Sequence, residues 1–185
     1  PAHFGTSPAN IGVLWGEPSC GVVDVDLDHE LAVRLGETLP ATSAVWGRAS
    51  KPRSHRLYRV RGTIETQQFS ARRPKPGGTK HEIRMLVEIR ADGSQTIAPG
   101  SVHPSGEIVR WDEDGAPGDI DSSALIGLVR EIAERVFVEA GLAACVNLLP
   151  GMVSIYAWQG TVETADEIVF LAKTRAALAE AAMAA

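Results

Sequence analysis

Carboxylates stand at every second position at the end of a short apolar segment, 21–28 (GVVDVDLD). Successive side chains of a strand point to opposite faces, so Asp24 and Asp26 share one face, with Asp28 if the strand continues. Two adjacent carboxylates stay ionised at low cost only when a cation lies between them. Mg²⁺ and Mn²⁺ prefer hard oxygen ligands and bind phosphates in turn. The spacing therefore predicts a divalent-cation site. The alternative is a strand entering an Asp-rich turn, where Asp28 caps a helix that begins near His29.

A third carboxylate could join this pair from another predicted strand. Glu88 and Arg90 alternate at the end of the segment 83–90, so they share one strand face. Asp24, Asp26 and Glu88 together could hold two divalent ions, which activate an attacking hydroxyl and neutralise a departing pyrophosphate. In the alternative interpretation, Glu88 and Arg90 form a solvated strand face.

Basic residues near these carboxylates could bind a polyanion. Between Arg48 and Arg90 the chain has twelve Lys and Arg residues and only three Glu residues. Ser54 and His55 begin a strand-like segment within this region. His55 and Arg90 would donate hydrogen bonds to a triphosphate, Arg90 through its bidentate fork. The alternative for His55 is a hydrogen-bonded histidine without a ligand.

Hydrophobic periodicity and turn residues predict the elements that position these side chains. The predicted strands of the first half are 10–15, 21–26, 44–46, 55–60, 83–89, 95–98 and 108–111, with a helix at 29–35. Residues 62–80 are predicted to form a basic loop or hairpin tip, and residues 112–123 an acidic connection. A long amphipathic helix at 124–140, strands at 142–149, 154–160 and 168–174, and an Ala-rich helix from Arg175 follow.

Composition bounds the class of protein. The chain has 185 residues, 44% of them hydrophobic, which is enough for one good core or two small ones. Its net charge of −5 argues against a protein that coats nucleic acid through bulk charge. Two cysteines without metal-ligand spacing, and no apolar run of transmembrane length, favour a cytoplasmic protein without a membrane partner.

The segment from about Asn10 to Trp111 resembles the catalytic core of bifunctional primase/polymerase (prim-pol) domains of the archaeo-eukaryotic primase superfamily, found in phage and plasmid replication proteins. The matching motifs are NIGVLWG, GVVDVDLD, SHRLY and LVEIRADGSQTIAPGSVHPSGE, in the order of the family. The last motif is long and idiosyncratic, which makes it the most specific match.

The resemblance assigns roles to individual residues. It implies that Mg²⁺ or Mn²⁺ is bound for nucleotidyl transfer by Asp24, Asp26 and Glu88. It implies nucleotide binding by Ser54, His55, Arg90, Ser101 and His103. The third acid is commonly Asp in the family and is Glu here, which should alter the metal geometry slightly without changing its role. The implied partners are a dNTP or NTP, a DNA template-primer and a replicative helicase.

The C-terminal sequence LAACVNLLPGMVSIYAWQGTVETADEIVFLAKTR instead resembles the middle of CutA proteins, which are small, trimeric, ferredoxin-like proteins linked to divalent-cation tolerance. The resemblance runs from about Glu131 to Leu178. It implies a partial ferredoxin-like helix-strand-strand-strand-helix segment and a homotrimer formed through it. The helix at 124–140 could belong to either family.

We therefore expect an α+β chain with two parts. Residues 1–118 would form a prim-pol-like mixed sheet with flanking helices, incomplete at its N-terminus, and residues 119–185 a CutA-like segment that completes the sheet or mediates oligomerisation. The expected activity is that of a metal-dependent nucleotidyltransferase, a DNA primase/polymerase. Two alternatives stay open: a CutA-like trimeric binding or scaffold protein, and an engineered chimera without activity.

Overall fold

A seven-stranded sheet forms the centre of the computed structural model, which describes residues 9–74, 81–140, 145–149 and 152–156. The strand order is β5-β6-β2-β4-β3-β8, and β9 pairs with β4 outside this path. The β4–β9 pair is parallel and the others are antiparallel, so the sheet is mixed. The strands are β2 (Val22–Asp26), β3 (Ala44–Arg48), β4 (Lys51–Arg61), β5 (Gln67–Pro74), β6 (His81–Arg90), β8 (Arg110–Asp114) and β9 (Gly118–Asp121).

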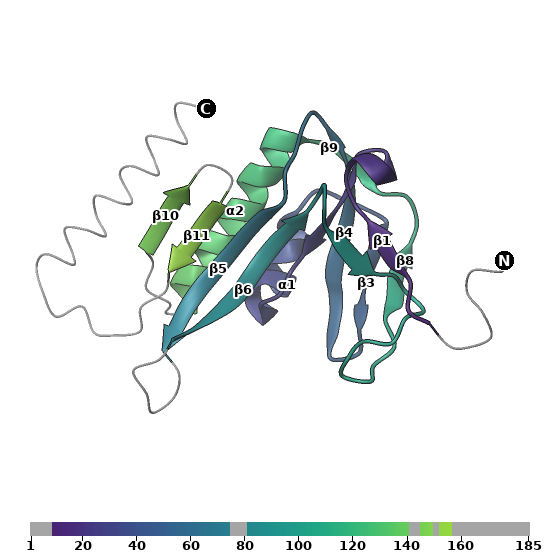
Figure 1. Cartoon of the computed structure of the whole chain (residues 1–185), viewed down its shortest axis with the longest axis horizontal. Coiled ribbons are helices and arrows are strands. Elements are labelled where there is room, and N and C mark those ends of the chain that lie inside the picture. The colour runs from purple at the N-terminus through teal and green to yellow at the C-terminus, as the bar shows by residue number, and fades with distance from the viewer. Residues whose placement is uncertain (1–8, 75–80, 141–144, 150–151, 157–185) are drawn as a thin grey trace, which may run out of the picture.

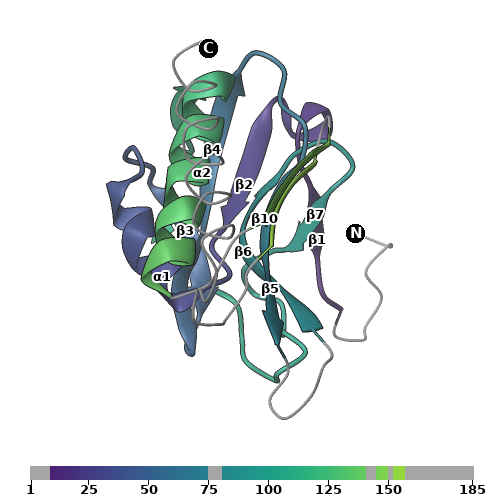
Figure 2. The same ribbon diagram turned by 90° about the vertical axis from the view of Figure 1, so that its left-hand side faces the viewer.

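Two helices cover one face of this sheet, and a short hairpin-like ribbon lies on the other (Figures 1 and 2). The helices are α1 (Glu30–Leu35) and α2 (Ser122–Glu139), and the ribbon pairs β1 (Gly12–Leu14) antiparallel with β7 (Gln95–Ile97). Single turns of 3₁₀ helix occur at Glu17–Ser19 and Gly36–Thr38. The expected α+β class with a many-stranded sheet is confirmed.

Strand β2 is buried on both faces, and its two faces differ in chemistry. Val23 and Val25 point into the larger core, which they share with α1 and α2. Val22 belongs to a second apolar cluster on the opposite side of the sheet, and the strand period of two places Asp24 and Asp26 on that same side. All five residues of β2 are buried, so both carboxylates are removed from bulk water. The sequence alternation therefore separates core-forming side chains from charged ones.

Helix α2 packs against the sheet and joins the core of the N-terminal strands. Its apolar residues recur at three- and four-residue spacing, which lines up Leu125, Val129, Ile132 and Val136 on one buried face. Full burial of each such side chain contributes roughly 1.5–3 kcal/mol. The sequence left open to which of the two families this helix belongs. In the structure it shares one core with β2 and β6.

Two segments expected to be irregular are strands instead. Gln67–Pro74, placed by sequence in a basic loop, forms β5, in which Phe69 and Ala71 enter the core while the residues between them are polar. The acidic stretch 112–123 contributes to β8, β9 and the start of α2. The loop prediction was wrong for Gln67–Pro74, whereas residues 75–80, the remaining part of the predicted loop or hairpin tip, lie outside the described residues. A strand that is short, or that has only one apolar face, gives a weaker sequence signal than the turn-like, polar residues around it.

The C-terminal part contains a separate two-stranded sheet. Strand β10 (Cys145–Leu149) pairs antiparallel with β11 (Met152–Tyr156), and β11 lies alongside β5 (Figure 1). The strand predicted at 168–174 and the helix predicted from Arg175 lie outside the described residues. Within the part of the chain that the structure describes, neither helix has the length and apolarity needed to cross a membrane.

Candidate functional site

The residues singled out by sequence form a row across the sheet. The register places Asp26 opposite Glu88 on β6 and opposite His55 on β4. One strand further out on each side, Gln68 on β5 pairs with Glu88, and Trp46 on β3 pairs with His55. Partners in adjacent strands have Cβ atoms about 4.5–5.5 Å apart, so this register gathers acidic and donor side chains on one face.

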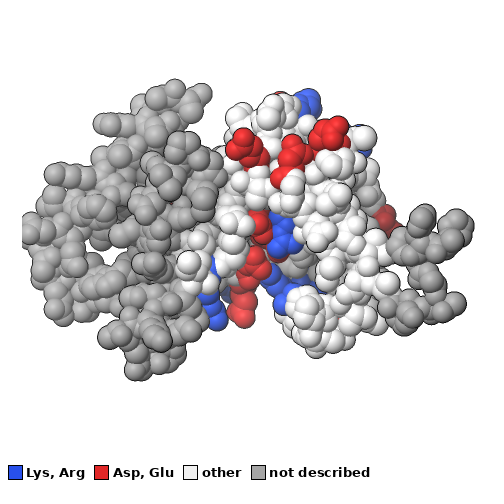
Figure 3. Space-filling model, in the orientation of Figure 1, with Lys and Arg blue, Asp and Glu red and all other residues white. Residues whose placement is uncertain are grey.

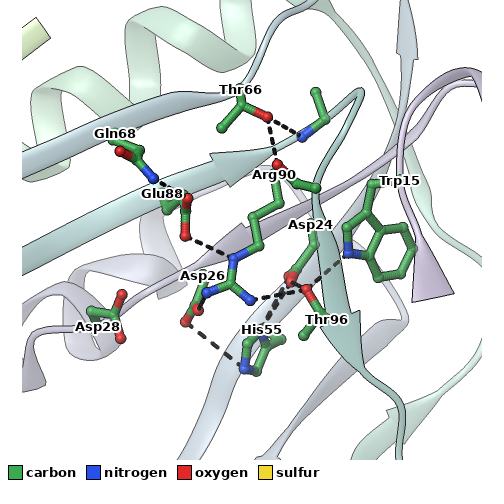
Figure 4. A network of polar contacts seen from close by, with 12 residues as sticks. Trp15, Asp24, Asp26, Asp28, His55, Thr66, Gln68, Glu88, Arg90 and Thr96 are labelled. Atoms are coloured by element: carbon green, nitrogen blue, oxygen red, sulfur yellow. Dashed lines mark hydrogen bonds and ion pairs between the residues drawn. The ribbon is translucent and has the colours of Figure 1, made fainter. Parts of the chain in front are cut away.

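Asp24 lies at the centre of a buried hydrogen-bond network beside this row (Figure 4). Its Oδ2 accepts a hydrogen bond from Thr96 Oγ1 at 2.6 Å and lies 3.0 Å from His55 Nδ1. Thr96 Oγ1 in turn accepts from Trp15 Nε1 at 2.8 Å and from Arg90 Nη1 at 3.1 Å. The β1–β7 ribbon therefore fixes the Asp24 carboxylate from above the sheet.

Arg90 bridges the other two carboxylates. Its Nη2 lies 2.7 Å from Asp26 Oδ2, and its Nε donates to Glu88 Oε2 at 2.7 Å. Gln68 Nε2 donates to the second oxygen of Glu88 at 2.7 Å. Asp26 Oδ1 is buried and has no hydrogen-bond partner among the described residues, although Lys51 Nζ and His55 Nε2 each lie 3.8 Å away. An oxygen in this position is available to a further cation.

Burial and charge change the protonation of this group of side chains. Burial raises the pKa of Asp26 to about 6, with Asp28 and Asp24 adding to the increase, while His55 and Arg90 oppose it. Burial would lower the pKa of His55, but the charges of Asp24 and Asp26 raise it above its ordinary value. The site therefore favours a protonated imidazole on His55 and disfavours an uncompensated charge on Asp26.

Asp28 pairs with a lysine and does not cap α1. Its Oδ1 lies 2.9 Å from Lys51 Nζ, which places a basic residue beside the carboxylates. The N-cap of α1 is His29, whose Nδ1 accepts from the backbone N–H of Leu31 at 3.1 Å. The alternative in which Asp28 serves only as a helix cap is therefore wrong.

A cavity of about 580 Å³ opens over the charged row, and red and blue side chains meet in the hollow at the middle of the face in Figure 3. Acidic residues contribute one part of its wall and basic residues another. The charged and histidine residues that line it are Asp26, Asp28, Arg48, Lys51, His55, Arg90 and His103. Its size suits a nucleotide-sized ligand, and its mixed charge suits an anion bound together with a cation.

Three further predicted nucleotide-binding residues differ in whether they line the cavity. His103 lines the cavity, and its Nδ1 lies 2.8 Å from Ser105 Oγ. Ser54 also lines the cavity, and its buried hydroxyl has no hydrogen-bond partner in the described part of the chain. Ser101 instead accepts from the backbone N–H of Ile11 at 3.1 Å and is not part of the cavity lining. Ser101 thus anchors the loop after β7 to the segment before β1.

Sequence reasoning missed the residues that orient the carboxylates and the imidazole. Trp46 stacks on His55 with ring centroids 5.3 Å apart and 17° between planes, which restrains the imidazole from the side of β3. Thr96, Trp15 and Gln68 fix Asp24 and Glu88 as described above. Trp15 and Thr96 lie within the segments NIGVLWG and LVEIRADGSQTIAPGSVHPSGE, but no role was assigned to them, and Trp46 and Gln68 lie outside the matched segments. Finding them requires knowing which residues of neighbouring strands lie opposite one another.

The donor set has the chemistry of a divalent-cation site, but Arg90 lies among the carboxylates. In the described residues, no three His, Cys, Asp or Glu side chains are arranged to hold a metal ion. The guanidinium between Asp26 and Glu88, and the imidazole on Asp24, supply the positive charge that a metal would supply. Carboxylate oxygens, among them Asp26 Oδ1, are the ligand type that Mg²⁺ and Mn²⁺ prefer, but in this structure Arg90 lies between the carboxylates of Asp26 and Glu88.

A carboxylate row beside a basic cavity wall is typical of proteins that bind phosphates together with a cation. Residues 3–133 match the sequence model of the family described as bifunctional DNA primase/polymerase, N-terminal. The match covers more than half of the chain, so the chain belongs to this family. Residues 128–185 match the model described as CutA1 divalent ion tolerance protein. The two matches overlap within α2, at residues 128–133.

Curated relatives match through CutA. Human Protein CutA is 35% identical over 102 residues, which is 53% of this chain and 52% of that protein. The divalent-cation tolerance protein CutA of Thermus thermophilus is 51% identical over 47 residues, 25% of this chain and 45% of that protein. The chain spans about half the length, or less, of these curated relatives. No solved structure matches the chain. The sequence thus joins a prim-pol part to a CutA-like part, as expected.

Proposed function

We propose that this protein is a metal-dependent nucleotidyltransferase that joins nucleotides onto a DNA primer or starts one. The observation that supports it most strongly is the row of Glu88, Asp26 and His55 on adjacent strands, with Asp24 beside it. Two members of this row, Asp26 and His55, line a nucleotide-sized cavity. The family membership of residues 3–133 supports the same class of reaction.

Asp24, Asp26 and Glu88 are the residues that would hold Mg²⁺ or Mn²⁺. When bound, such ions lower the pKa of the attacking hydroxyl and neutralise charge on the leaving pyrophosphate. Thr96 and Trp15 hold the Asp24 carboxylate in one orientation through their hydrogen bonds. The stabilised orientation reduces the rearrangement needed when a cation and a nucleotide enter.

His55 and Arg90 would orient the triphosphate. His55 is restrained by stacking on Trp46 and contacts Asp24 on its Nδ1 side. The raised pKa of His55 favours the imidazolium, which is a hydrogen-bond donor at both ring nitrogens. Arg90 would exchange its contacts with Asp26 and Glu88 for hydrogen bonds that its planar fork donates to two phosphate oxygens.

Calorimetric titration of dATP with Mn²⁺ tests the proposal directly. We expect saturable binding to the wild-type chain that disappears on addition of EDTA, and a loss of at least about 10-fold in affinity for Asp24→Ala, since a charged ligand group is removed. Circular dichroism of both proteins establishes that they are folded. Undiminished, metal-dependent binding by Asp24→Ala would remove this residue from the metal-binding set.

The C-terminal segment 119–185 has a separate proposed role, assembly of a homotrimer, which its CutA match supports. We expect light scattering after size exclusion to give about three times the chain mass of 19.7 kDa. Deletion of residues 141–185, which leaves α2 in the core, should return the protein to a monomer. A full-length chain that elutes as a monomer at micromolar concentration would contradict this role.

A further inference from the structure

Glu107 connects two loops at the rim of the cavity through one carboxylate. Its Oε1 accepts from the backbone N–H of Ser50 at 2.7 Å, and its Oε2 accepts from Ser50 Oγ at 2.8 Å and from Ser105 Oγ at 2.9 Å. Ser50 lies in the turn between β3 and β4, whereas Ser105 belongs to the segment between β7 and β8. These two turns are far apart in sequence, and Glu107 fastens them together.

Arg48 is held by the same carboxylate at only one of its nitrogens. Its Nε lies 3.2 Å from Glu107 Oε2 and donates to Ser50 Oγ at 3.2 Å. Both of these contacts of Arg48 involve Nε, and Arg48 lines the cavity. A guanidinium fixed at Nε presents its remaining fork to a ligand, and that fork matches two phosphate oxygens.

The geometry of the turn that carries Arg48 is itself restricted. Gly47 also lines the cavity, and a Cβ at this position would overlap the carbonyl oxygen of Lys51 across the turn. Lys51 lines the cavity too, and its ammonium lies 2.9 Å from Asp28. The close crossing at Gly47 therefore brings Arg48 and Lys51 to the same wall.

His103 reaches the cavity through the other side of the Glu107 network. Its Nδ1 is engaged by Ser105 Oγ at 2.8 Å, and its backbone N–H donates to the carbonyl of Glu107 at 2.8 Å. The Nε2 atom is then the remaining polar atom of the ring. Hydrogen bonds from Ser50 and Ser105 hold the pKa of Glu107 well below its usual range, at about 2, so the network persists at all physiological pH values.

We propose that Glu107 is a positioning residue that holds Arg48 and His103 on the cavity wall as the binding site for the outer phosphates of a nucleoside triphosphate. The inference rests on the proposed function and names the part of the cavity that receives the tail of the substrate. Arg48 contacts the phosphates directly, with Lys51 beside it, and Glu107 acts through Arg48.

Simple electrostatics and positioning predict opposite results when Glu107 is removed. An acidic group near a phosphate site repels the ligand, so its loss would tighten binding if proximity were its only effect. If Glu107 positions Arg48, its loss weakens binding despite the favourable change in charge. The direction in which dATP affinity changes therefore distinguishes electrostatic repulsion by Glu107 from positioning of Arg48 by Glu107.

The test is calorimetric titration of dATP, dADP and dAMP with Mn²⁺ into the full chain. For Arg48→Ala we expect dATP to bind about 10-fold more weakly or worse, as for loss of a charge-assisted hydrogen bond, while dAMP changes less than about 3-fold. Glu107→Ala should also weaken dATP binding, and Glu107→Gln should weaken it less. The double variant should lose less affinity for dATP than the two single losses combined, because Glu107 acts in part through Arg48.

Asp121→Ala is the matched control, since it removes an acid from a surface ion pair with Arg61 that does not line the cavity. It should bind all three nucleotides as the wild type does. Equal or tighter dATP binding by Glu107→Ala or Glu107→Gln overturns the inference while leaving the proposed function intact. A wild-type chain that binds no dATP overturns the proposed function and the inference with it.

Discussion

Asp26→Asn is expected to lower nucleotidyl transfer by roughly 10²–10⁴-fold, because metal charge stabilisation is worth several kcal/mol and each factor of ten corresponds to about 1.4 kcal/mol. The side chain is 5% exposed, and its Oδ1 has no hydrogen-bond partner within the part of the chain that the structure describes. Primer extension with Mn²⁺ measures the loss. Turnover within a few-fold of the wild type would remove Asp26 from the catalytic group.

The same substitution is expected to leave the fold intact and to favour it at neutral pH. Burial raises the pKa of Asp26 to about 6, above the ordinary value of 3.8, so the ionised carboxylate destabilises the metal-free native state once the pH exceeds that range. Relative to the wild type, Asp26→Asn should therefore gain stability as the pH rises from about 4 to about 7, by roughly 3 kcal/mol at most. Urea unfolding in EDTA measures this difference. A variant that loses relative stability over that interval would contradict the assignment.

Arg90→Ala should have the opposite effect on stability. Its guanidinium contacts Asp26 and Glu88 at 2.7 Å, and both carboxylates are buried. Removing one member of a buried ion pair costs about 3–5 kcal/mol, and the low end applies here because Arg90 keeps 23% of its side-chain surface exposed. The loss, measured in EDTA by urea unfolding, arises from carboxylates left without a counter-charge.

Divalent metal should restore much of that stability. If Arg90 holds the place of a cation among Asp24, Asp26 and Glu88, then Mn²⁺ binds Arg90→Ala more tightly than the wild type and stabilises it more. Thermal unfolding over a Mn²⁺ series measures both effects. Arg61→Ala is the control, since Arg61 pairs with Asp121 at the surface, away from the cavity. An equal Mn²⁺ response in wild type and Arg90→Ala would show that the metal binds elsewhere.

The residues of the candidate site were predictable because their signal is local. Alternation along a strand placed Asp24 with Asp26, and Glu88 with Arg90, and this period of two depends only on backbone geometry. The basic region between Arg48 and Arg90 pointed to His55, and the resemblance to prim-pol domains implied the same role. The structure brings all five together on neighbouring strands. Ser101 does not join this group, since its hydroxyl accepts a hydrogen bond from the backbone N–H of Ile11.

Strand β5 and helix α2 show what local sequence patterns cannot predict. Gln67–Pro74 exposes polar residues on one side and follows no apolar run, so only pairing with β6 and burial of Phe69 reveal it as a strand. The amphipathic pattern of α2 predicted a helix, but not the surface that it covers. Its place against β6 follows from packing, because an apolar helix face is stabilised by whichever sheet face is available.

The sequence by itself determined which side chains could carry the chemistry, and the two families to which its parts are related. The tertiary structure decided the strand register that aligns Glu88, Asp26 and His55, and the insertion of Arg90 between two carboxylates. It also decided the anchoring of Asp24 by Thr96 and of Arg48 by Glu107. These contacts join residues far apart in the chain, and no local periodicity encodes a register between distant strands.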